Sequence, residues 1–256
     1  MGRIKTPEDV PAGWNVISVD TVDSTNTVAM ELGDKDAPHG TVVLADRQTK
    51  GRGRLGREWA SPAGNIFMSI LLRPAVPPAD AVLLTMTAAV ACTRALRDAT
   101  GLHVGIKWPN DLMVSGKKLG GILTEMKSRG RRVLFAVVGI GINLNSEAAD
   151  FSSGLRTTVT SLRAETGKKI RKTGLIFRIL REMGLWYDEL IQGGRDRILD
   201  EWKGLSVTLG RRVRITSGSE MLEGFAETLD EEGRLIVKLA SGVRKVVSAG
   251  DVTMVR

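Results

Sequence analysis

Cysteine and histidine are scarce in this chain of 256 residues, and their scarcity removes several kinds of chemistry. The single cysteine, Cys92, excludes an internal disulfide, and its place among apolar residues at helical spacing favours a buried structural thiol over a nucleophile. The two histidines, His39 and His103, lie far apart in segments that we expect to be loops. Neither a zinc site nor a Ser-His-Asp triad is therefore expected.

Long apolar runs and aromatic residues are also lacking. No apolar run reaches the roughly 18 residues that a membrane-spanning helix needs, and the N-terminus lacks the basic-then-apolar order of a signal peptide. These absences predict a cytoplasmic protein without a membrane partner. Aromatic residues make up 4% of the chain, so the stacking platforms of single-strand nucleic-acid binders are scarce.

The charge is positive and unevenly distributed. The formal net charge is +8 and the sequence pI is near 9.9, which raises the possibility of a nucleic-acid partner. From residue 205 to the C-terminus, however, eight Lys and Arg face seven Asp and Glu, a balance of +1. The excess therefore belongs to the first 204 residues, where we expect it to serve anionic substrates and an acidic acceptor protein.

The most informative stretch reads Lys-Trp-Pro-Asn-Asp at residues 107–111 and is followed by Lys118. It puts a cation, a carboxamide and a carboxylate at the end of one short strand, with a second cation across a tight Ser115-Gly116 turn. Asn110 and Asp111 can hold a hydrated magnesium ion or ribose hydroxyls, and Lys118 can neutralise charge as it develops on a carboxylate or phosphate oxygen. Such a cluster suits phosphoryl or nucleotidyl transfer.

A basic glycine loop lies upstream and reads Gly-Arg-Gly-Arg-Leu-Gly-Arg at residues 51–57. Its glycines match the dinucleotide fingerprint G-x-G-x-x-G, but that motif needs a helix to begin within it, and residues 58–64 form a breaker-rich segment instead. We interpret the segment as a flexible loop that folds over a bound anion, with Arg52, Arg54 and Arg57 supplying charge-assisted hydrogen bonds. The alternative is a solvated basic loop.

Hydrophobic periodicity predicts an α+β fold, with a mixed central sheet and helices on one side, followed by a small β domain. Strands are expected at 14–21, 41–47, 65–72, 106–114, 118–126 and 132–143, and helices at 24–32, 78–100, 173–191 and 195–203. Five short strands at 207–209, 213–215, 225–227, 235–237 and 245–247 show the pattern of a small SH3-like barrel. The expected domains are 1–204 and 205–256.

Several motifs occur together in the order seen in biotin protein ligases, and from about residue 16 the chain resembles a biotin–[acetyl-CoA-carboxylase] ligase. They are Ser24-Thr25-Asn26, Gln48 before the glycine loop, KWPND at 107–111, KLGGILTE at 118–125 and GIGINLN at 139–145. The resemblance implies a catalytic core similar to class II aminoacyl-tRNA synthetases, plus the C-terminal SH3-like barrel.

Members of this family that also repress transcription carry a winged helix-turn-helix ahead of the catalytic domain. Here Ser24 already begins the first substrate motif. We therefore expect a monofunctional ligase without sequence-specific DNA binding, which a duplex titration at physiological salt checks.

The implied chemistry has two steps. The carboxylate of biotin attacks the α-phosphorus of ATP to give biotinyl-5'-AMP and pyrophosphate, and a lysine of a biotin carboxyl carrier protein then attacks the mixed anhydride and releases AMP. Neither step needs a protein nucleophile, so cations and positioning are expected to supply most of the rate enhancement. ATP and biotin are the substrates, and Mg2+ is the expected metal ion.

The resemblance also assigns roles to individual residues. Residues implied in binding biotin are Ser24, Thr25, Asn26, Gln48, Arg52, Gly53, Arg54, Lys118, Gly139 and Gly141. Those implied for ATP are Arg52, Arg54, Arg57, Asn110, Asp111, Lys118 and Asn143. The expected catalytic residues are Lys118, Arg54 and Arg52, and Asp111 is the candidate magnesium contact.

Some readings stay open on the sequence alone. Ser24 and Thr25 could serve only to cap a helix, and Trp108 and Trp59 suit either core packing or a ligand contact. Leu55 stands where many relatives place a polar or basic residue. A lipoate protein ligase and a basic nucleic-acid-binding protein are the alternative functions, and a free sheet edge could form a homodimer.

Overall fold

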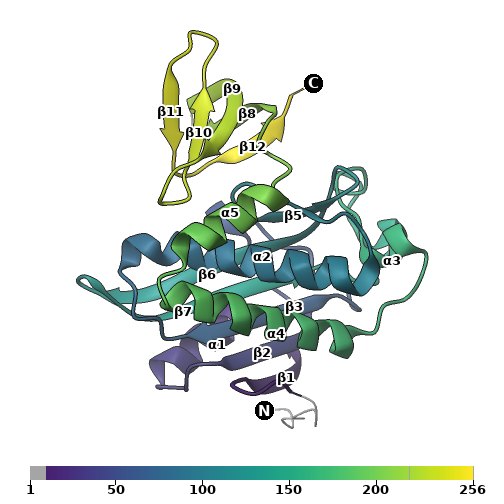
Figure 1. Cartoon of the computed structure of the whole chain (residues 1–256). Helices are drawn as coiled ribbons and strands as arrows, with labels where there is room; N and C mark the ends of the chain where they lie inside the picture. The colour runs from purple at the N-terminus through teal and green to yellow at the C-terminus, as the bar shows by residue number, and fades with distance from the viewer. Residues whose placement is uncertain (1–9, 219, 256) are drawn as a thin grey trace.

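The computed structural model describes residues 10–218 and 220–255 and contains two sheets (Figure 1). The larger sheet has seven strands in the order β1-β2-β3-β7-β6-β5-β4. Only β1 and β2 pair in parallel, so the sheet is mixed, as predicted. Its strands are β1 (Asn15–Val22), β2 (Thr41–Gln48), β3 (Ile66–Leu72), β4 (Gly105–Lys107), β5 (Asp111–Val114), β6 (Lys117–Arg129) and β7 (Arg132–Ile142).

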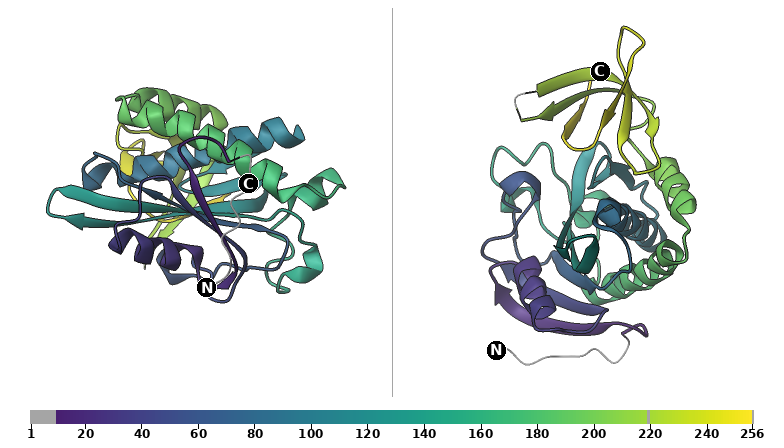
Figure 2. Two further views of the ribbon diagram at one scale, coloured as in Figure 1. Left: turned by 90° about the horizontal axis from the view of Figure 1, so that it is seen from below. Right: turned by 90° about the vertical axis from the view of Figure 1, so that its left-hand side faces the viewer.

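Helices cover both faces of this sheet, which corrects the expectation of helices on one side (Figure 2). One face packs against α1 (Thr25–Asp34) through a small cluster that includes Ala29, Val43 and Phe135. The opposite face carries the long helices, which are α2 (Ala81–Thr100), α4 (Lys172–Ile191) and α5 (Arg195–Leu205). A sheet covered on both faces needs strands that are apolar on both sides, and every residue of β3 is buried.

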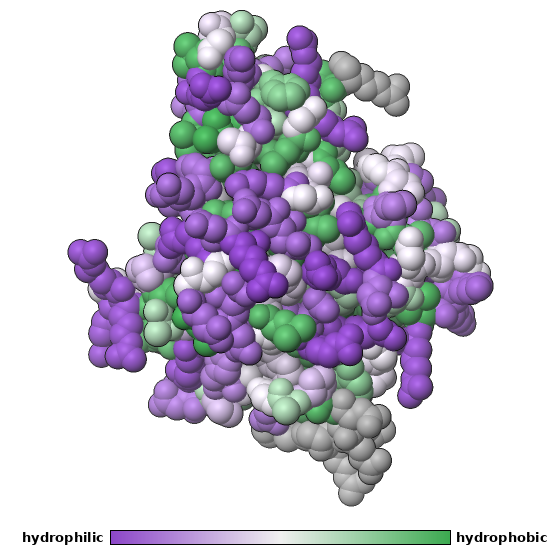
Figure 3. Space-filling view, in the orientation of Figure 1, coloured by the Kyte–Doolittle hydropathy of each residue, from purple (hydrophilic) through white to green (hydrophobic). Residues whose placement is uncertain are grey.

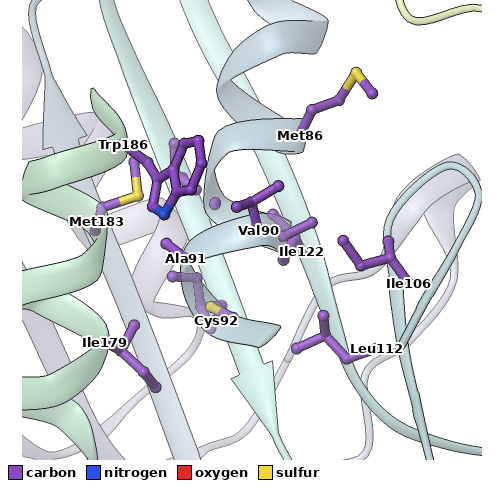
Figure 4. Packing of buried hydrophobic residues seen from close by; sticks show 14 of the residues in the cluster. Met86, Val90, Ala91, Cys92, Ile106, Leu112, Ile122, Ile179, Met183 and Trp186 are labelled. Carbon is purple, nitrogen blue, oxygen red and sulfur yellow. The ribbon is translucent and has the colours of Figure 1, made fainter. Parts of the chain in front are cut away.

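Helix α2 is the centre of the larger core. Helix α2 and the turn before it cover residues 78–100, which are long and apolar enough to cross a membrane by length and composition. The most apolar 18-residue stretch has a mean hydropathy of 1.4, but 67% of that stretch is buried inside the protein. Figure 4 shows Val90, Ala91 and Cys92 of this helix facing Ile179 and Met183 of α4 and Ile122 of β6. The apolar surface of α2 is therefore used in the core.

Cys92 is fully buried on this helix, and burial raises the pKa of its thiol to about 12. At pH 8 roughly one thiol in ten thousand is then ionised, and the thiolate is the reactive form. We expect the native protein to react with a maleimide at least about a hundredfold more slowly than the protein in urea. Mass spectrometry of timed samples measures both rates, and equal rates would contradict the packing of α2.

The expected strand at 106–114 is interrupted. Residues 108–110 form a turn between β4 and β5, and these two strands pair antiparallel, with Lys107 opposite Asp111. The predicted tight turn at Ser115 and Gly116 is confirmed, since both have positive φ and join β5 to β6. The turn at 108–110 therefore lies beside the first half of β6. Asn110 in this turn donates from its Nδ2 to the carbonyl of Ile122 at 2.6 Å.

The smaller sheet is antiparallel, with the order β11-β10-β9-β8-β12. Four of the five predicted C-terminal strands are present, but 207–209 is a turn segment and a final strand was missed. The strands are β8 (Arg212–Ser217), β9 (Glu220–Leu229), β10 (Leu235–Lys238), β11 (Arg244–Val247) and β12 (Asp251–Met254). The boundary proposed at residue 204 falls near the end of α5. Figure 3 shows more hydrophobic surface on this sheet than over α4 and α5.

Trp108 joins the two parts of the protein. Its indole Nε1 donates to the carbonyl of Gly233 at 3.1 Å, and its backbone N–H donates to Thr208 Oγ1 at 2.9 Å. The residue is 2% exposed and packs in the larger core, and it also lines the cavity described below. Nearby, the Val207 N–H donates to the Ile106 carbonyl, which covers the edge strand β4. Within the described residues, β1 is the other edge of the large sheet, where dimer formation remains a prediction.

Candidate functional site

A cavity of about 330 Å³ opens where the large sheet, the glycine loop and the small sheet meet. Its walls come from segments that are distant in sequence, including the start of α1, the end of β2, the turn at 108–110, and the middle of β6 and β7. All but one of the predicted site residues line it, namely Ser24, Thr25, Asn26, Gln48, Arg52, Gly53, Arg54, Arg57, Asn110, Asp111, Lys118, Gly139 and Gly141.

One part of the wall is a buried polar pocket at the N-terminus of α1. The N–H of Thr25 donates to Gln48 Oε1 at 2.9 Å, and the Thr25 hydroxyl lies 3.2 Å from the same oxygen. Gln48 Nε2 in turn donates to Ser61 Oγ at 3.1 Å. Ser24 occupies the N-cap position, yet its side chain makes no capping hydrogen bond. Capping alone therefore does not explain Ser24, whose side chain lines the cavity while 3% exposed.

Asn26 is held from several directions. Its Nδ2 donates to the Leu123 carbonyl at 3.2 Å and to Glu125 Oε2 at 2.8 Å, and its Oδ1 accepts from the buried Ser69 hydroxyl at 2.6 Å. Gly139 of β7 makes room for this arrangement, because a Cβ there would overlap Asn26 Oδ1. The absence of a side chain at Gly139 thus leaves the space that the amide of Asn26 occupies.

The substitution Gly139→Ala tests this close approach. The added methyl group would overlap Asn26 Oδ1, which accepts from Ser69, so it must displace an amide whose Oδ1 and Nδ2 together make three hydrogen bonds. For the biotin-dependent reaction that the sequence resemblance implies, we expect the KM for biotin to rise about fivefold with a small loss of stability, which overpacking of a well-filled site produces. Gly154→Ala is the control, because no atom lies within 4 Å of the Cβ it would add. Equal KM values in the two variants would contradict this role.

A cluster of cations surrounds Asp111. Lys118 Nζ lies 2.6 Å from Asp111 Oδ1, and Lys107 Nζ lies 3.6 Å from its Oδ2. Lys118 is partly buried, and its ammonium group also lies 5.3 Å from the centre of the Trp59 ring. The preceding residue, Lys117, is exposed. Lys118 therefore presents a positive charge at the cavity wall, held by a carboxylate on one side and an aromatic ring on the other.

The glycine loop lies over the cavity, and its three arginines contact three different elements. Arg52 pairs with Glu125 of β6, Arg54 Nη1 donates to Asn110 Oδ1 at 3.2 Å, and Arg57 pairs with Asp251 of β12. Burial is the main cause that lowers the pKa of Arg54 from its usual value, with Asp111 acting in the opposite direction. The loop thus forms part of the cavity wall, although Arg52 and Arg57 themselves are exposed.

Leu55 lies at the outer turn of this loop. Its φ is 57° and its side chain is 67% exposed. The side chain does not line the cavity. In this conformation Leu55 therefore makes no direct contribution to the wall of the site.

Asn143 is the predicted residue that the structure does not bring to the cavity. Its Nδ2 donates to the Thr160 carbonyl at 3.0 Å, and its own N–H donates to the Leu119 carbonyl at 2.9 Å. The Thr160 N–H then donates to the Lys118 carbonyl at 2.9 Å. The amide of Asn143 therefore supports the backbone of Lys118, and its predicted contact with the nucleotide has no geometric support here.

Trp59, which the sequence left unassigned, lines the cavity. Its ring lies over two glycines of adjacent strands, because a Cβ would come within 2.6 Å of the ring at Gly141 and within 3.1 Å at Gly121. The indole Nε1 is buried and has no hydrogen-bond partner among the described residues. Gly141 therefore makes room for Trp59, and its predicted contact with biotin stays a prediction.

Other wall residues had no signal strong enough to identify them from the sequence. The C-terminal sheet contributes Gly250, Asp251, Val252 and Thr253, at the start of β12. Lys107 was noted as part of a motif but was given no role. The Asp251 pair with Arg57 shows that the small sheet contacts the glycine loop directly.

The predicted magnesium contact of Asp111 lacks a suitable set of ligands. Both carboxylate oxygens face lysine ammonium groups, at 2.6 Å and 3.6 Å. Across residues 10–218 and 220–255, no group of three or more His, Cys, Asp or Glu is placed to hold a metal ion. Mg2+ usually keeps several waters and is held by one or two carboxylates with substrate phosphates. These residues fit magnesium that arrives with ATP, not an ion that the protein binds alone.

Comparisons with known proteins match both parts of the fold. Residues 18–143 match the Biotin/lipoate A/B protein ligase family, and residues 208–255 match the Biotin protein ligase C terminal domain. The Bifunctional ligase/repressor BirA of Bacillus subtilis (strain 168) is 39% identical over 238 residues, which span 93% of this chain and 73% of the relative. The Biotin–[acetyl-CoA-carboxylase] ligase of Paracoccus denitrificans is 34% identical over 90% of this chain and 96% of the relative.

Solved structures agree with these matches. A biotin protein ligase from Aquifex aeolicus in complex with biotin and ATP has a TM-score of 0.81 and 28% identity, and covers 94% of this chain and 99% of its own. The sheet, the cavity and the matched families define a ligase of the biotin/lipoate class. Within that class, the chain belongs to the biotin protein ligase family.

Proposed function

We propose that this ligase activates biotin with ATP as biotinyl-5'-AMP and transfers the biotinyl group to a specific lysine of a biotin carboxyl carrier protein. The observation that carries the proposal is that one cavity contains both a buried hydrogen-bonding pocket and, next to it, a cluster of cations. A neutral polar head group suits the pocket of Thr25, Asn26 and Gln48. An anion suits the wall made by Lys118, Lys107 and Arg54.

The first step joins two anions, which repel each other in water. The biotin carboxylate attacks the α-phosphorus of ATP, the bond between the α-phosphorus and the bridging oxygen breaks, and pyrophosphate leaves. Lys118 and Arg54 offset the charge that builds on the carboxylate and phosphate oxygens. Both cations are held before the reaction, Lys118 by Asp111 and Arg54 by Asn110, so little reorganisation is needed.

In the second step a neutral lysine amine of the carrier attacks the carbonyl carbon of the mixed anhydride, and AMP leaves with the electron pair of the broken C–O bond. The same cations face the departing phosphate. Arg52 and Arg57 hold the glycine loop over the intermediate through Glu125 and Asp251. A closed loop keeps water from the anhydride, which would otherwise hydrolyse it.

The partner and the compartment follow from this chemistry. Relatives named as biotin–[acetyl-CoA-carboxylase] ligases support a biotin carrier protein as the acceptor. The reaction needs ATP and an unmodified carrier, so we propose the cytoplasm as the compartment. We also retain the division into a catalytic domain at 1–204 and a C-terminal domain at 205–256, although Asp251 contributes to the wall of the cavity.

Transfer to a carrier domain tests this function. Purified protein is incubated with ATP, magnesium and radiolabelled biotin, and with either a biotin carrier domain or the same domain with its acceptor lysine changed to arginine. We expect label only on the domain that keeps its lysine. A parallel reaction uses lipoate and a lipoyl domain. Label there, with none on the biotin carrier domain, would contradict the proposal.

A further inference from the structure

Glu125 of β6 is bonded at once to the glycine loop and to the polar pocket. Its Oε2 accepts from Arg52 Nη2 at 2.7 Å and from Asn26 Nδ2 at 2.8 Å. The Arg52 side chain is 43% exposed and that of Glu125 is 29% exposed. One carboxylate oxygen thus joins a cation of the loop to an amide of the pocket.

The other loop arginines have no such shared partner. Arg54 is bonded to Asn110, in the turn between β4 and β5, and Arg57 pairs with Asp251 of the small sheet. Neither Asn110 nor Asp251 is hydrogen-bonded to the pocket of Thr25, Asn26 and Gln48 in the described residues. Glu125 therefore differs from the other anchors of the loop, because the position of its carboxylate depends on both neighbours.

The two contacts of Glu125 do not serve to satisfy a carboxylate buried in the core, because Glu125 is only partly buried. The residue lies on the outer half of β6, beyond Leu123, where the strand becomes partly exposed. The two contacts span 73 and 99 residues of sequence, so they form only when β6, the loop and α1 are assembled. A carboxylate placed there between an amide and a guanidinium favours a site of defined geometry, since charge-assisted hydrogen bonds are short and directional.

We propose that Glu125 is a positioning residue that holds Arg52 of the glycine loop over the cavity and makes this closure depend on Asn26. Closure retains the activated intermediate until the carrier arrives. This proposal rests on the proposed function, because Arg52 and Asn26 act on biotin and its adenylate there.

The variant Glu125→Gln changes the charge while keeping the shape. The glutamine carbonyl can still accept from Asn26, but its neutral amide binds Arg52 more weakly. We expect the KM for biotin in pyrophosphate exchange to rise about fivefold, with kcat within about twofold of the wild type. The rate at which preformed biotinyl-AMP leaves the protein, measured by rapid filtration, should rise by a similar factor. A purely structural role would not change the rate of release in a folded variant.

A matched control comes from another ion pair. Arg94 and Glu201 also lie 2.7 Å apart, with side chains 48% and 29% exposed, and they join α2 to α5 away from the cavity. Glu201→Gln therefore removes a pair of similar geometry and exposure. We expect its exchange kinetics and adenylate release to equal those of the wild type within about twofold.

A double-mutant cycle with Arg52→Gln separates the two contacts. If Glu125 acts through Arg52, Glu125→Gln changes adenylate release by less than about twofold in the Arg52→Gln background. A full fivefold effect in that background, or no effect of Glu125→Gln alone, would overturn the proposal.

Glu125→Asp is the second variant and keeps the charge while shortening its reach. It should show an intermediate rate of release, and circular dichroism verifies that each variant is folded. Exchange by the wild-type protein independently tests the proposed function, so failure of one idea does not conceal failure of the other.

Discussion

Replacing Lys118 with alanine is expected to lower biotin-dependent pyrophosphate exchange by at least about tenfold, which corresponds to about 1.4 kcal/mol of transition-state stabilisation. The ammonium group lies at the cavity wall, 2.6 Å from Asp111 and 5.3 Å from the centre of the Trp59 ring. Its removal deletes the charge that offsets the developing negative charge on substrate oxygens. It also leaves the Asp111 carboxylate facing the anions without its nearest cation, with Lys107 at 3.6 Å.

Lys117→Ala is the control for this change. The two lysines are adjacent, but Lys117 is exposed and does not line the cavity. Its loss should leave the exchange rate within about twofold, as expected for a surface charge. Lys118→Arg should retain part of the activity, because the charge is kept while the geometry changes. Equal rates for Lys118→Ala and Lys117→Ala would show that Lys118 has no part in adenylation.

Arg54→Ala is also expected to reduce exchange by at least about tenfold. Arg54 is the most enclosed of the loop arginines: burial lowers its pKa, and its Nη1 donates to Asn110 Oδ1 at 3.2 Å. A cation partly withdrawn from water acts more strongly on a substrate phosphate than a solvated one. A guanidinium group is not deprotonated in proteins, so Arg54 stays charged across the usual assay range.

Arg131→Ala provides the comparison for Arg54. Arg131 is an exposed residue in the turn between β6 and β7, and its loss changes the net charge by the same amount. Initial rates of exchange at low and at moderate salt distinguish a local effect from a long-range one, because exposed charges are screened. A loss that appears in both variants and disappears with salt would contradict a specific contact of Arg54 with the substrate.

Motifs that are continuous in the sequence contain most of the predicted residues that line the cavity. The Lys107 to Asp111 segment, Lys118 and the basic glycine loop all contain groups whose chemistry is evident from residue type. The family resemblance supplied their order, and the cavity brings them together. The long helices and the tight turn at Ser115 and Gly116 were also predicted from the sequence. Hydrophobic periodicity and a turn with positive φ both depend on residues that are neighbours in the chain.

Features that depend on distant contacts were missed. The close fit of Gly139 to Asn26 and of Gly141 to Trp59 joins segments that meet only in the folded sheet. Asn143 belongs to a conspicuous motif, yet its amide binds the Thr160 carbonyl. No local pattern distinguishes an asparagine that binds a nucleotide from one that holds a neighbouring loop.

The packing on both faces of the sheet could have been inferred. The segment 66–72 is apolar apart from Ser69, and such a run is typical of a strand covered on both sides. In contrast, the contribution of Asp251 had no signal in the sequence. It depends on how the small sheet sits against the glycine loop, which the pairing of Arg57 with Asp251 records.

Exchange of labelled pyrophosphate into ATP tests the central claim most directly. The purified protein, with magnesium and ATP, is assayed with biotin, with lipoate and with neither. Exchange that requires biotin is the predicted result. Labelled pyrophosphate enters ATP only when biotinyl-AMP forms from a bound carboxylate and the adenylation step then runs in reverse. Exchange that requires lipoate, or none with either acid in protein shown to be folded, would contradict the claim that this cavity activates biotin.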